Sequence, residues 1–238
     1  MTALTGGLGG GGLAEYAVAK EIYTVHRSPE VSAAEGACLP IAALTAYTAL
    51  TKSAKIELHK NAPQKNILIT AASGGVGLYA VQLAKLGNNH VTATCGARNI
   101  DLVKTLGADE VLDYNTPEGE SLKSPSGRKY DAVIHCTEAR RAWSIFEANL
   151  SGDGVVVDLT PGVSDFLRYG LQRVWFTKKK LVFLFVGIVN DELKYMVDLV
   201  KEGKIKSVIE FKCRLSEGGD GWRKMISGHA TGKIVVEQ

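Results

Sequence analysis

The sequence predicts an α/β protein built on a doubly wound parallel sheet. A short apolar strand at Asn66–Ala72 runs directly into a glycine turn and then into a helix, which is the order that a nucleotide-binding unit requires. Further apolar strands alternate with helices as far as Lys201. Several of these strands are almost continuously apolar, as strands buried on both faces of a parallel sheet are.

The residues before this regular region predict a different kind of structure. Gly6 to Gly12 is expected to form a flexible loop or tail. The stretch Leu13–Val18 alternates in the manner of a strand. Ser32, followed three residues later by Glu35, predicts a capping box that opens a short helix. From Leu39 to Leu50 the chain is apolar and is expected to be helical.

The regular region predicts its elements in alternation. Strands are expected at Asn66–Ala72, His90–Cys95, Glu110–Leu112, Tyr130–Cys136, Gly154–Leu159 and Leu181–Val186. Helices are expected at Gly75–Leu86, Ile100–Leu106, Ala142–Asn149 and Asp191–Lys201, the second of them stopped by Gly107. A last helix at Trp222–Gly228 and a strand at Gly232–Glu237 do not obviously continue the parallel sheet, and with Leu13–Val18 they predict part of a second structure.

Composition limits the classes of function. The 238 residues are 45% hydrophobic and 22% charged, with a net charge of +3, which describes a soluble α/β protein and does not demand nucleic acid or an anionic membrane as a partner. No apolar run reaches the roughly 20 residues that span a bilayer. Peripheral membrane contact stays possible through Lys178, Lys179 and Lys180, although a solvated loop is the simpler interpretation of that flank.

The four cysteines argue against a metal site and against a disulfide scaffold. They are scattered along the chain, with no C-x-x-C pair and no cluster with histidine; they are Cys38, Cys95, Cys136 and Cys213. Separate buried thiols in a reducing compartment explain this pattern. The sequence therefore predicts no bound metal.

The glycine turn predicts a dinucleotide site. In the segment from Ala72 to Gly77, Gly74 and Gly77 hold two positions of the G-x-G-x-x-G pattern, and Ala72 replaces its first glycine. Glycines let the backbone approach a pyrophosphate closely. The helix that follows offers free N–H groups and the positive end of its dipole to the anion.

The tip of the second strand favours NADPH over NADH. An NAD-selective site places Asp or Glu there to bind the ribose 2′-hydroxyl, whereas this strand ends in Cys95, Gly96, Ala97 and Arg98 without a carboxylate. The Arg98 guanidinium can bind a 2′-phosphate through two hydrogen bonds, and Tyr114 can add a hydroxyl. A solvated surface arginine is the alternative interpretation of Arg98.

Several motifs together resemble one family. They are Gly12–Tyr16, Leu39–Tyr47, Ala71–Gly77, Ala80–Lys85, Leu106–Asp109 and His229–Lys233. In combination they resemble the zinc-free, zeta-crystallin-like quinone oxidoreductases of the medium-chain dehydrogenase/reductase superfamily. The segments Thr92–Asn99 and Ser124–Gly127 are most similar to the plant chloroplast-envelope branch of that family.

The resemblance implies a domain organisation. Residues 1–42 would be the remnant of a GroES-like catalytic domain whose greater part is absent, residues 43–207 an NADPH-binding Rossmann domain, and residues 208–238 a return to the remnant. It also implies cofactor-binding roles for Thr45, Ser73, Gly74, Gly75, Val76, Arg98, Tyr114, Cys136, Thr137, Thr160, Pro161, Gly232 and Lys233. Burial alone is the simpler explanation of Cys136, and helix packing is nearly as good an explanation of Thr45.

The implied activity is NADPH-dependent reduction of quinones or of the C=C bond of α,β-unsaturated carbonyls. No catalytic proton donor can be named, although Tyr47 and Lys233 carry suitable groups. A non-catalytic NADPH-binding sensor or adaptor is the alternative, and RNA binding is disfavoured by the modest charge. The resemblance also implies a homodimer joined through the Leu181–Val186 edge and a location in the chloroplast envelope or stroma, with the cytoplasm as the alternative.

Overall fold

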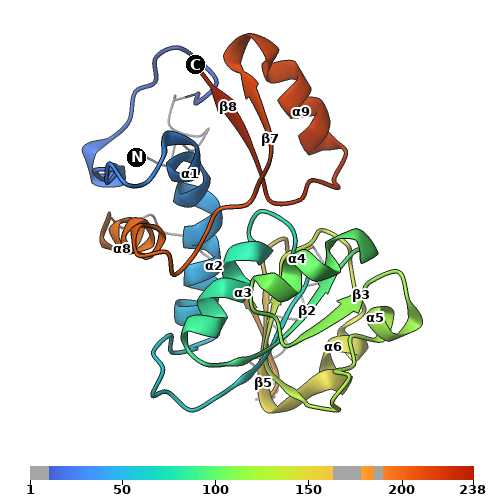
Figure 1. Cartoon of the computed structure of the whole chain (residues 1–238). Coiled ribbons are helices and arrows are strands. Elements are labelled where there is room, and N and C mark those ends of the chain that lie inside the picture. Colours follow the sequence, from blue (N-terminus) through green and yellow to red (C-terminus); the bar gives the residue numbers. More distant parts are fainter. Residues whose placement is uncertain (1–10, 163–177, 185–189) are drawn as a thin grey trace. The chain divides into compact units, whose positions relative to one another are not determined.

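The computed structural model describes residues 11–162, 178–184 and 190–238 (Figure 1). The chain divides into two compact units. The first contains residues 1–45 and 186–238, and the second contains residues 46–185. The predicted boundaries at residues 42 and 207 say which segments correspond to which domain of the family. The division into two compact units does not test that correspondence, so it stays a prediction.

A six-stranded parallel sheet forms the centre of the second unit. Its strand order is β3-β2-β1-β4-β5-β6, and every neighbouring pair is parallel. The strands are β1 Asn66–Ile69, β2 His90–Cys95, β3 Glu110–Asp113, β4 Tyr130–His135, β5 Leu150–Asp158 and β6 Lys180–Phe183. The order reverses between β1 and β4, so the predicted doubly wound sheet is confirmed and its switch point lies beside the glycine turn.

Helices connect these strands and cover the sheet. They are α3 Gly77–Leu86, α4 Ile100–Thr105, α5 Pro117–Ser121 and α6 Trp143–Asn149, with a short 3₁₀ turn, η5 Ala97–Asn99, before α4. The chain moves from β1 outward to β3 and then from β4 outward to β6. Because such crossovers are right-handed, the two halves place their helices on opposite faces. Gly107, with a φ of +109°, lies just past the end of α4, as predicted.

One apolar cluster packs α6 against the sheet. Phe146 of α6 contacts it, with Trp143 and Ile145 beside it, and the sheet and its loops contribute Leu68, Leu122, Tyr130, Val133, Leu150, Val156, Leu181 and Phe183. Burying side chains of this size contributes about 1.5–3 kcal/mol each. The cluster fixes the loop between β4 and α6, which carries several candidate site residues.

The first unit consists of helices and a two-stranded sheet. Ser32 caps α1 (Ala33–Cys38) through the predicted capping box, with Glu35 Oε2 accepting from the Ser32 N–H at 3.1 Å. The chain continues through η3 (Leu39–Ala43), α2 (Leu44–Thr48) and η4 (Ala49–Ser53), the last of which belongs to the second unit. The remaining elements are η2 Glu21–Tyr23, α8 Asn190–Lys201, β7 Ile209–Arg214, η6 Leu215–Glu217, α9 Gly218–Ile226 and β8 Lys233–Glu237.

Three sequence-based expectations need correction. Leu13–Val18 is not a strand: its residues are exposed, and no strand in the described ranges pairs with it. The side-chain amide of Gln238 donates to the carbonyls of Ala14 and Glu15, at 3.0 and 2.7 Å. The strand β7, which pairs in parallel with β8, was not predicted, and α9 begins four residues before Trp222. Residues 185 and 186 of the expected strand Leu181–Val186 lie outside the described residues.

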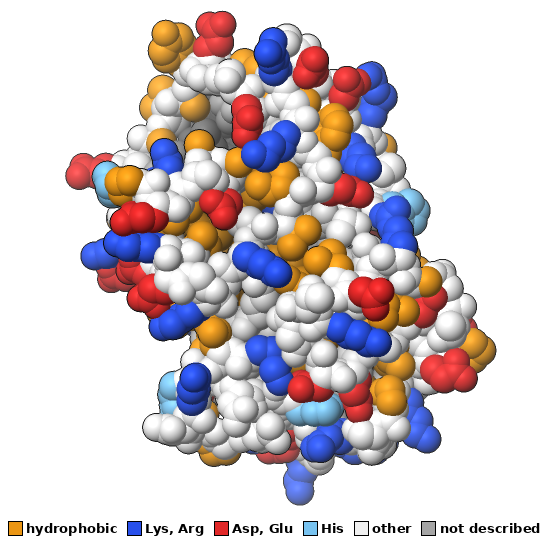
Figure 2. Space-filling model, in the orientation of Figure 1, with side chains coloured by type: hydrophobic (Ala, Val, Ile, Leu, Met, Phe, Trp, Pro, Cys, Tyr) orange, Lys and Arg blue, Asp and Glu red, His pale blue; other side chains and the backbone are white. Residues whose placement is uncertain are grey.

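Among the residues that the structure describes, one helix is long and apolar enough, by length and composition, to cross a membrane. It runs over Ala33–Ser53, and 72% of its most apolar window is buried within the protein, as in the core helix of a folded domain. On the face drawn in Figure 2, Lys and Arg side chains alternate with Asp and Glu side chains.

Glu110 of β3 is an ionised carboxylate held by hydroxyl groups. Thr92 Oγ1 and Ser124 Oγ donate to Glu110 Oε2 at 2.8 and 2.7 Å, and the Ser126 N–H donates to Oε1 at 3.0 Å. Burial alone would raise the pKa of Glu110, but the hydrogen bonds from Ser126, Ser124 and Thr92 outweigh it and lower the pKa from 4.5 to about 2.

The folded-state pKa of Glu110 lies below its unfolded value, so its stabilising contribution is present above pH 4.5 and is lost as the pH falls toward 2. Between pH 6 and pH 3 we expect the gap in unfolding free energy between wild type and Glu110→Gln to narrow by about 2 kcal/mol. Urea unfolding at several pH values measures the gap, with Glu120→Gln on exposed α5 as the control. A gap that stays constant over this range would contradict the assignment.

Candidate nucleotide-binding site

The turn after β1 is tied to the neighbouring strand. The Ala72 N–H donates to the Thr94 carbonyl at 2.8 Å, and the Ala71 N–H donates to Thr94 Oγ1 at 3.3 Å. Ala71 takes a φ of +49°, a backbone conformation that non-glycine residues rarely adopt. Its carbonyl accepts from the Gly74 N–H at 2.9 Å, which closes the turn. The chain is thereby turned sharply at the carboxyl end of the sheet.

Gly77 lets α3 approach this turn closely. A Cβ atom at Gly77 would lie 2.3 Å from the Ala71 carbonyl oxygen and 2.7 Å from the Ala72 Cα atom. Both contacts are with backbone, which cannot move aside without breaking the turn. Gly77 therefore has the role of the third glycine in a dinucleotide fingerprint, which is to pack helix against strand.

The first turn of α3 offers unused hydrogen-bond donors. The N–H groups of Leu78 and Ala80 bond to the Gly74 and Val76 carbonyls, at 3.1 and 3.0 Å. Among the residues that the structure describes, the N–H groups of Gly75, Val76 and Gly77 donate to no protein acceptor. Free donors at the N-terminus of a ten-residue helix form an anion site.

Three further candidates gather at the carboxyl ends of β1, β2 and β3. Ser73 Oγ accepts from Asn99 Nδ2 at 3.1 Å, and Arg98 precedes Asn99 in η5 with its side chain exposed. The Tyr114 hydroxyl lies 3.2 Å from the position of a Cβ on Gly96. The sequence did not identify Asn99, because its partner Ser73 lies 26 residues away and nothing local marks the pair.

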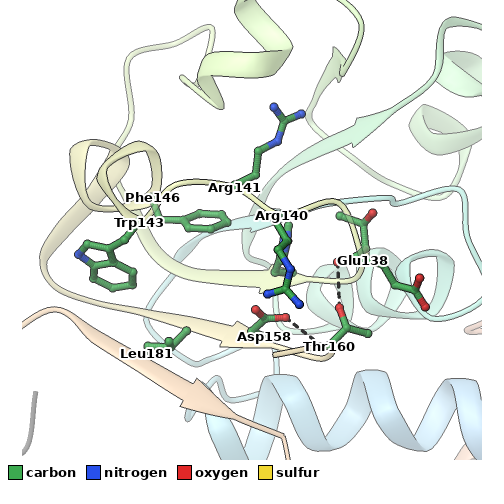
Figure 3. A pocket seen from close by; sticks show the side chains of 10 residues that line it. Glu138, Arg140, Arg141, Trp143, Phe146, Asp158, Thr160 and Leu181 are labelled. Carbon is green, nitrogen blue, oxygen red and sulfur yellow. Dashed lines mark hydrogen bonds between the residues drawn. The ribbon is translucent and has the colours of Figure 1, made fainter. Parts of the chain in front are cut away.

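The ends of β4 and β5 carry the remaining candidates of this unit. Thr160 Oγ1 donates to the Thr137 carbonyl at 3.0 Å, and the Thr160 N–H donates to Asp158 Oδ1 at 2.9 Å. Pro161 follows directly. Beside them lies a cavity of about 60 Å³, drawn in Figure 3. In that view the Arg140 side chain points toward Asp158 and Thr160, and its guanidinium fills the space that a Cβ on Gly162 would need.

The thiols near the site are poor nucleophiles. Burial, together with the Asp158 charge, raises the pKa of the Cys136 thiol to about 12. Burial and the Asp113 charge raise the pKa of Cys95 to about 11. Since the thiolate is the reactive form, neither side chain is suited to covalent chemistry at neutral pH.

Three predicted residues belong to the first unit. Thr45 lies on α2. Gly232 has a φ of +78°, and a Cβ there would lie 2.3 Å from the Val208 carbonyl oxygen, to which the Lys233 N–H donates at 2.8 Å. Burial lowers the pKa of Lys233, and the nearby Cys38 partly opposes this. Their assignment to the cofactor stays a prediction.

The residues present do not fit a metal site. Within residues 11–162, 178–184 and 190–238 no three His, Cys, Asp or Glu side chains are grouped so that they could hold an ion. The four cysteines are free thiols and are separated from one another.

Comparison with known proteins agrees with this architecture. The family model described as zinc-binding dehydrogenase matches residues 106–236. The chain is 61% identical over 237 residues to quinone-oxidoreductase QR1, chloroplastic, of Triphysaria versicolor, covering 100% of this chain and 72% of that protein. It is 58% identical over 237 residues to the chloroplast envelope quinone oxidoreductase homolog of Arabidopsis thaliana, with the same coverage.

A solved structure gives the same fold. The quinone oxidoreductase from Coxiella burnetii superimposes with a TM-score of 0.76 at 27% identity, over 90% of this chain and 63% of that chain. Fold and glycine turn define a nucleotide-binding oxidoreductase of the α/β class. The chain belongs to the medium-chain dehydrogenase/reductase superfamily, and within it to the quinone oxidoreductases that these relatives represent.

The raised pKa values of Cys136 and Cys95 give a test. Disulfide-exchange labelling of Cys136 and Cys95 at pH 7.5 is expected to be roughly 100-fold slower in the folded protein than after unfolding in urea, because their raised pKa values leave little thiolate. Absorbance of the released thiol measures the rate, and Cys136→Ser identifies the contribution of that residue. A rapid phase in the folded protein that disappears in Cys136→Ser would contradict the assignment.

Proposed function

We propose that this chain is an NADPH-dependent oxidoreductase that reduces quinones or the C=C bond of α,β-unsaturated carbonyls. The proposal is carried by one observation: the free N–H groups of Gly75, Val76 and Gly77 at the start of α3. They lie beside the β1–β4 switch point, where doubly wound sheets bind dinucleotides.

The adenosine end of the site supports NADPH. Arg98 and Tyr114 follow the ends of β2 and β3. None of the residues from Gly96 to Asn99 after β2 is a carboxylate, and Asp113, at the end of β3, is the residue that pairs with Cys95. The Asn99–Ser73 hydrogen bond ties the Arg98 turn to the glycine turn. In this proposal the guanidinium binds the 2′-phosphate while the glycine turn holds the pyrophosphate.

The ends of β4 and β5 are assigned further contacts with the cofactor. Cys136 and Thr137 would flank the adenosine or its ribose, and Thr160 and Pro161 would border the nicotinamide ribose. Thr45, Gly232 and Lys233 of the first unit belong to the same proposal. When bound, NADPH would supply a hydride to the acceptor, and the chain's part is to orient the cofactor and exclude water.

Non-catalytic NADPH binding is the second candidate, and a surface of the first unit favours it. Trp222, Met225 and Ile226 of α9 are 48%, 54% and 78% exposed, although their i, i+3, i+4 spacing is that of a packed helix face. The chain spans 72% of each chloroplast relative. An exposed apolar face of this kind suits contact with another protein, as an NADPH-binding sensor or adaptor would make.

Location and assembly complete the proposal. The names of the two relatives support a place in the chloroplast. In the described residues β6 pairs only with β5, and such an open edge supports the predicted homodimer.

Arg98 provides the test of cofactor choice. Arg98→Ala is expected to weaken NADPH binding by about 10–100-fold and NADH binding by less than about threefold, because only NADPH carries the 2′-phosphate. Fluorescence titration of both nucleotides measures the ratio. Arg128→Ala is the matched control, because Arg128 is exposed before the start of β4 and its guanidinium is 3.4 Å from Asn66 Oδ1. An unchanged ratio in Arg98→Ala would remove the case for NADPH.

A turnover assay separates the two candidate functions. The enzyme proposal expects the absorbance of NADPH to fall in the presence of phenanthrenequinone or a reactive enone, at a rate that Arg98→Ala lowers by about tenfold or more at subsaturating NADPH. Saturable binding of NADPH without loss of absorbance favours the binding module. The absence of both binding and turnover in folded protein would overturn both candidates.

A further inference from the structure

His135, at the end of β4, joins two strand ends of the nucleotide site. Its side chain is 4% exposed. Nδ1 lies 3.0 Å from Thr70 Oγ1, the hydroxyl of the first residue after β1, and Nε2 lies 3.2 Å from the Ala139 carbonyl oxygen. The same hydroxyl accepts from the Cys136 N–H at 3.0 Å, and the Thr70 N–H donates to the Ile134 carbonyl at 3.1 Å.

The hydrogen-bond roles in this cluster can be assigned from chemistry. The Ala139 carbonyl can only accept, so Nε2 of His135 carries a proton. The Cys136 N–H can only donate, so Thr70 Oγ1 accepts there and keeps its own proton to donate. A neutral imidazole with its proton on Nε2 leaves Nδ1 as the acceptor for that proton. All four polar groups are then satisfied together, which buried groups require.

Packing holds the imidazole in this orientation. The ring meets Phe146 of α6 edge-on, with centroids 5.1 Å apart and planes at 74°. Phe146 is itself part of the apolar cluster on the sheet. This contact restrains the plane of the ring, and the partners at Thr70 and Ala139 determine which ring edge carries the nitrogens.

The loop that His135 holds is the one that carries candidate cofactor residues. The Ala139 N–H donates to Thr137 Oγ1 at 3.1 Å, and the Thr137 carbonyl accepts from Thr160 Oγ1 at 3.0 Å. The chain of contacts therefore runs from the glycine turn after β1, through Thr70 and His135, to the loop after β4, and on to the end of β5.

We propose that His135 is a positioning residue of the nucleotide site, which as the neutral Nε2–H imidazole fixes the loop after β4 relative to the glycine turn. The proposal rests on the proposed NADPH site. It goes beyond that site because neither His135 nor Thr70 is among the residues assigned to contact the cofactor. Their effect is transmitted through Cys136, Thr137 and Thr160.

Four variants test the role against simple core packing. His135→Phe keeps the ring beside Phe146 and removes both nitrogens. His135→Gln keeps a donor near the position of Nε2. Thr70→Val removes the hydroxyl at nearly constant volume, and Thr70→Ser keeps it. Titration with NADPH, thermal unfolding, and nitrogen NMR of the imidazole in the wild-type protein are the measurements.

We expect His135→Phe and Thr70→Val each to weaken NADPH binding by about 5–50-fold. His135→Gln and Thr70→Ser should each recover most of the loss. The double variant His135→Phe with Thr70→Val should bind NADPH at most about threefold more weakly than the weaker-binding single variant, because both changes break the same hydrogen-bond network. The ratio of NADPH to NADH affinity, which Arg98 sets, should stay constant throughout.

Several results would overturn the proposal. They are NADPH affinity within twofold of wild type in both His135→Phe and Thr70→Val, fully additive losses in the double variant, or a wild-type imidazole that carries its proton on Nδ1. If His135→Phe does not fold, NADPH titration of Thr70→Val and Thr70→Ser and the nitrogen NMR of the wild-type imidazole still test the proposal. Wild-type protein that binds no NADPH would overturn the proposed function and this role with it, whereas binding that is insensitive to these variants would overturn this role alone.

Discussion

The contact on which the nucleotide unit depends is the close approach of the α3 backbone to the end of β1. Gly77 lies so near the Ala71 carbonyl that no side chain fits between them. That closeness places the first N–H groups of α3 beside the strand end, and it requires the sharp turn in which Ala71 takes a positive φ. Thr94 of β2 holds this turn through both its carbonyl and its hydroxyl. The position of the glycine turn therefore depends on the pairing of β1 with β2.

The central position of β1 explains how separate parts of the site are kept in register. β1 pairs with β2 on one side and with β4 on the other. Its end therefore meets the Arg98 turn through the Asn99–Ser73 bond and the loop after β4 through Thr70 and His135. The Arg98 turn and the loop after β4, which both carry candidate site residues, are thereby connected through one strand end.

Local patterns predicted the sheet because its strands are buried on both faces, which leaves continuous apolar runs such as those of β1, β2 and β4. Where a segment is not buried on both faces, the prediction was wrong or incomplete. Leu13–Val18 alternates like a strand but has no pairing partner in the described residues. β7 was missed although Ile209, Phe211 and Cys213 alternate with polar residues, which is the pattern of a half-buried strand and not of a strand buried on both faces. Strand ends also differed by a few residues, since β1 stops at Ile69, where the turn conformation begins.

The contacts of Thr70 with His135 and of Ser73 with Asn99 could not be predicted, because each joins residues brought together by the register of the parallel strands. Ile69 pairs with Ile134, and this alone sets Thr70 beside His135, which is 65 residues away. In the sequence His135 follows the apolar run Ala132–Ile134 in a strand that also contains Asp131, and that pattern is equally consistent with a core histidine. Position in a register, which sequence patterns do not encode, distinguishes the two.

The two units differ in how far their candidate elements are formed by their own residues. The hydrogen bonds that shape the glycine turn all come from residues 46–185, so this turn is formed within the second unit. The first unit is less self-sufficient. Its β7–β8 sheet has two strands, which is marginal on its own, and α9 packs on it through Gly221, whose Cβ position lies 3.4 Å from Cys213 Sγ. The outward side chains Trp222, Met225 and Ile226 of α9 remain exposed, so this small sheet is covered by α9 on the Gly221 side of the helix alone among the described contacts.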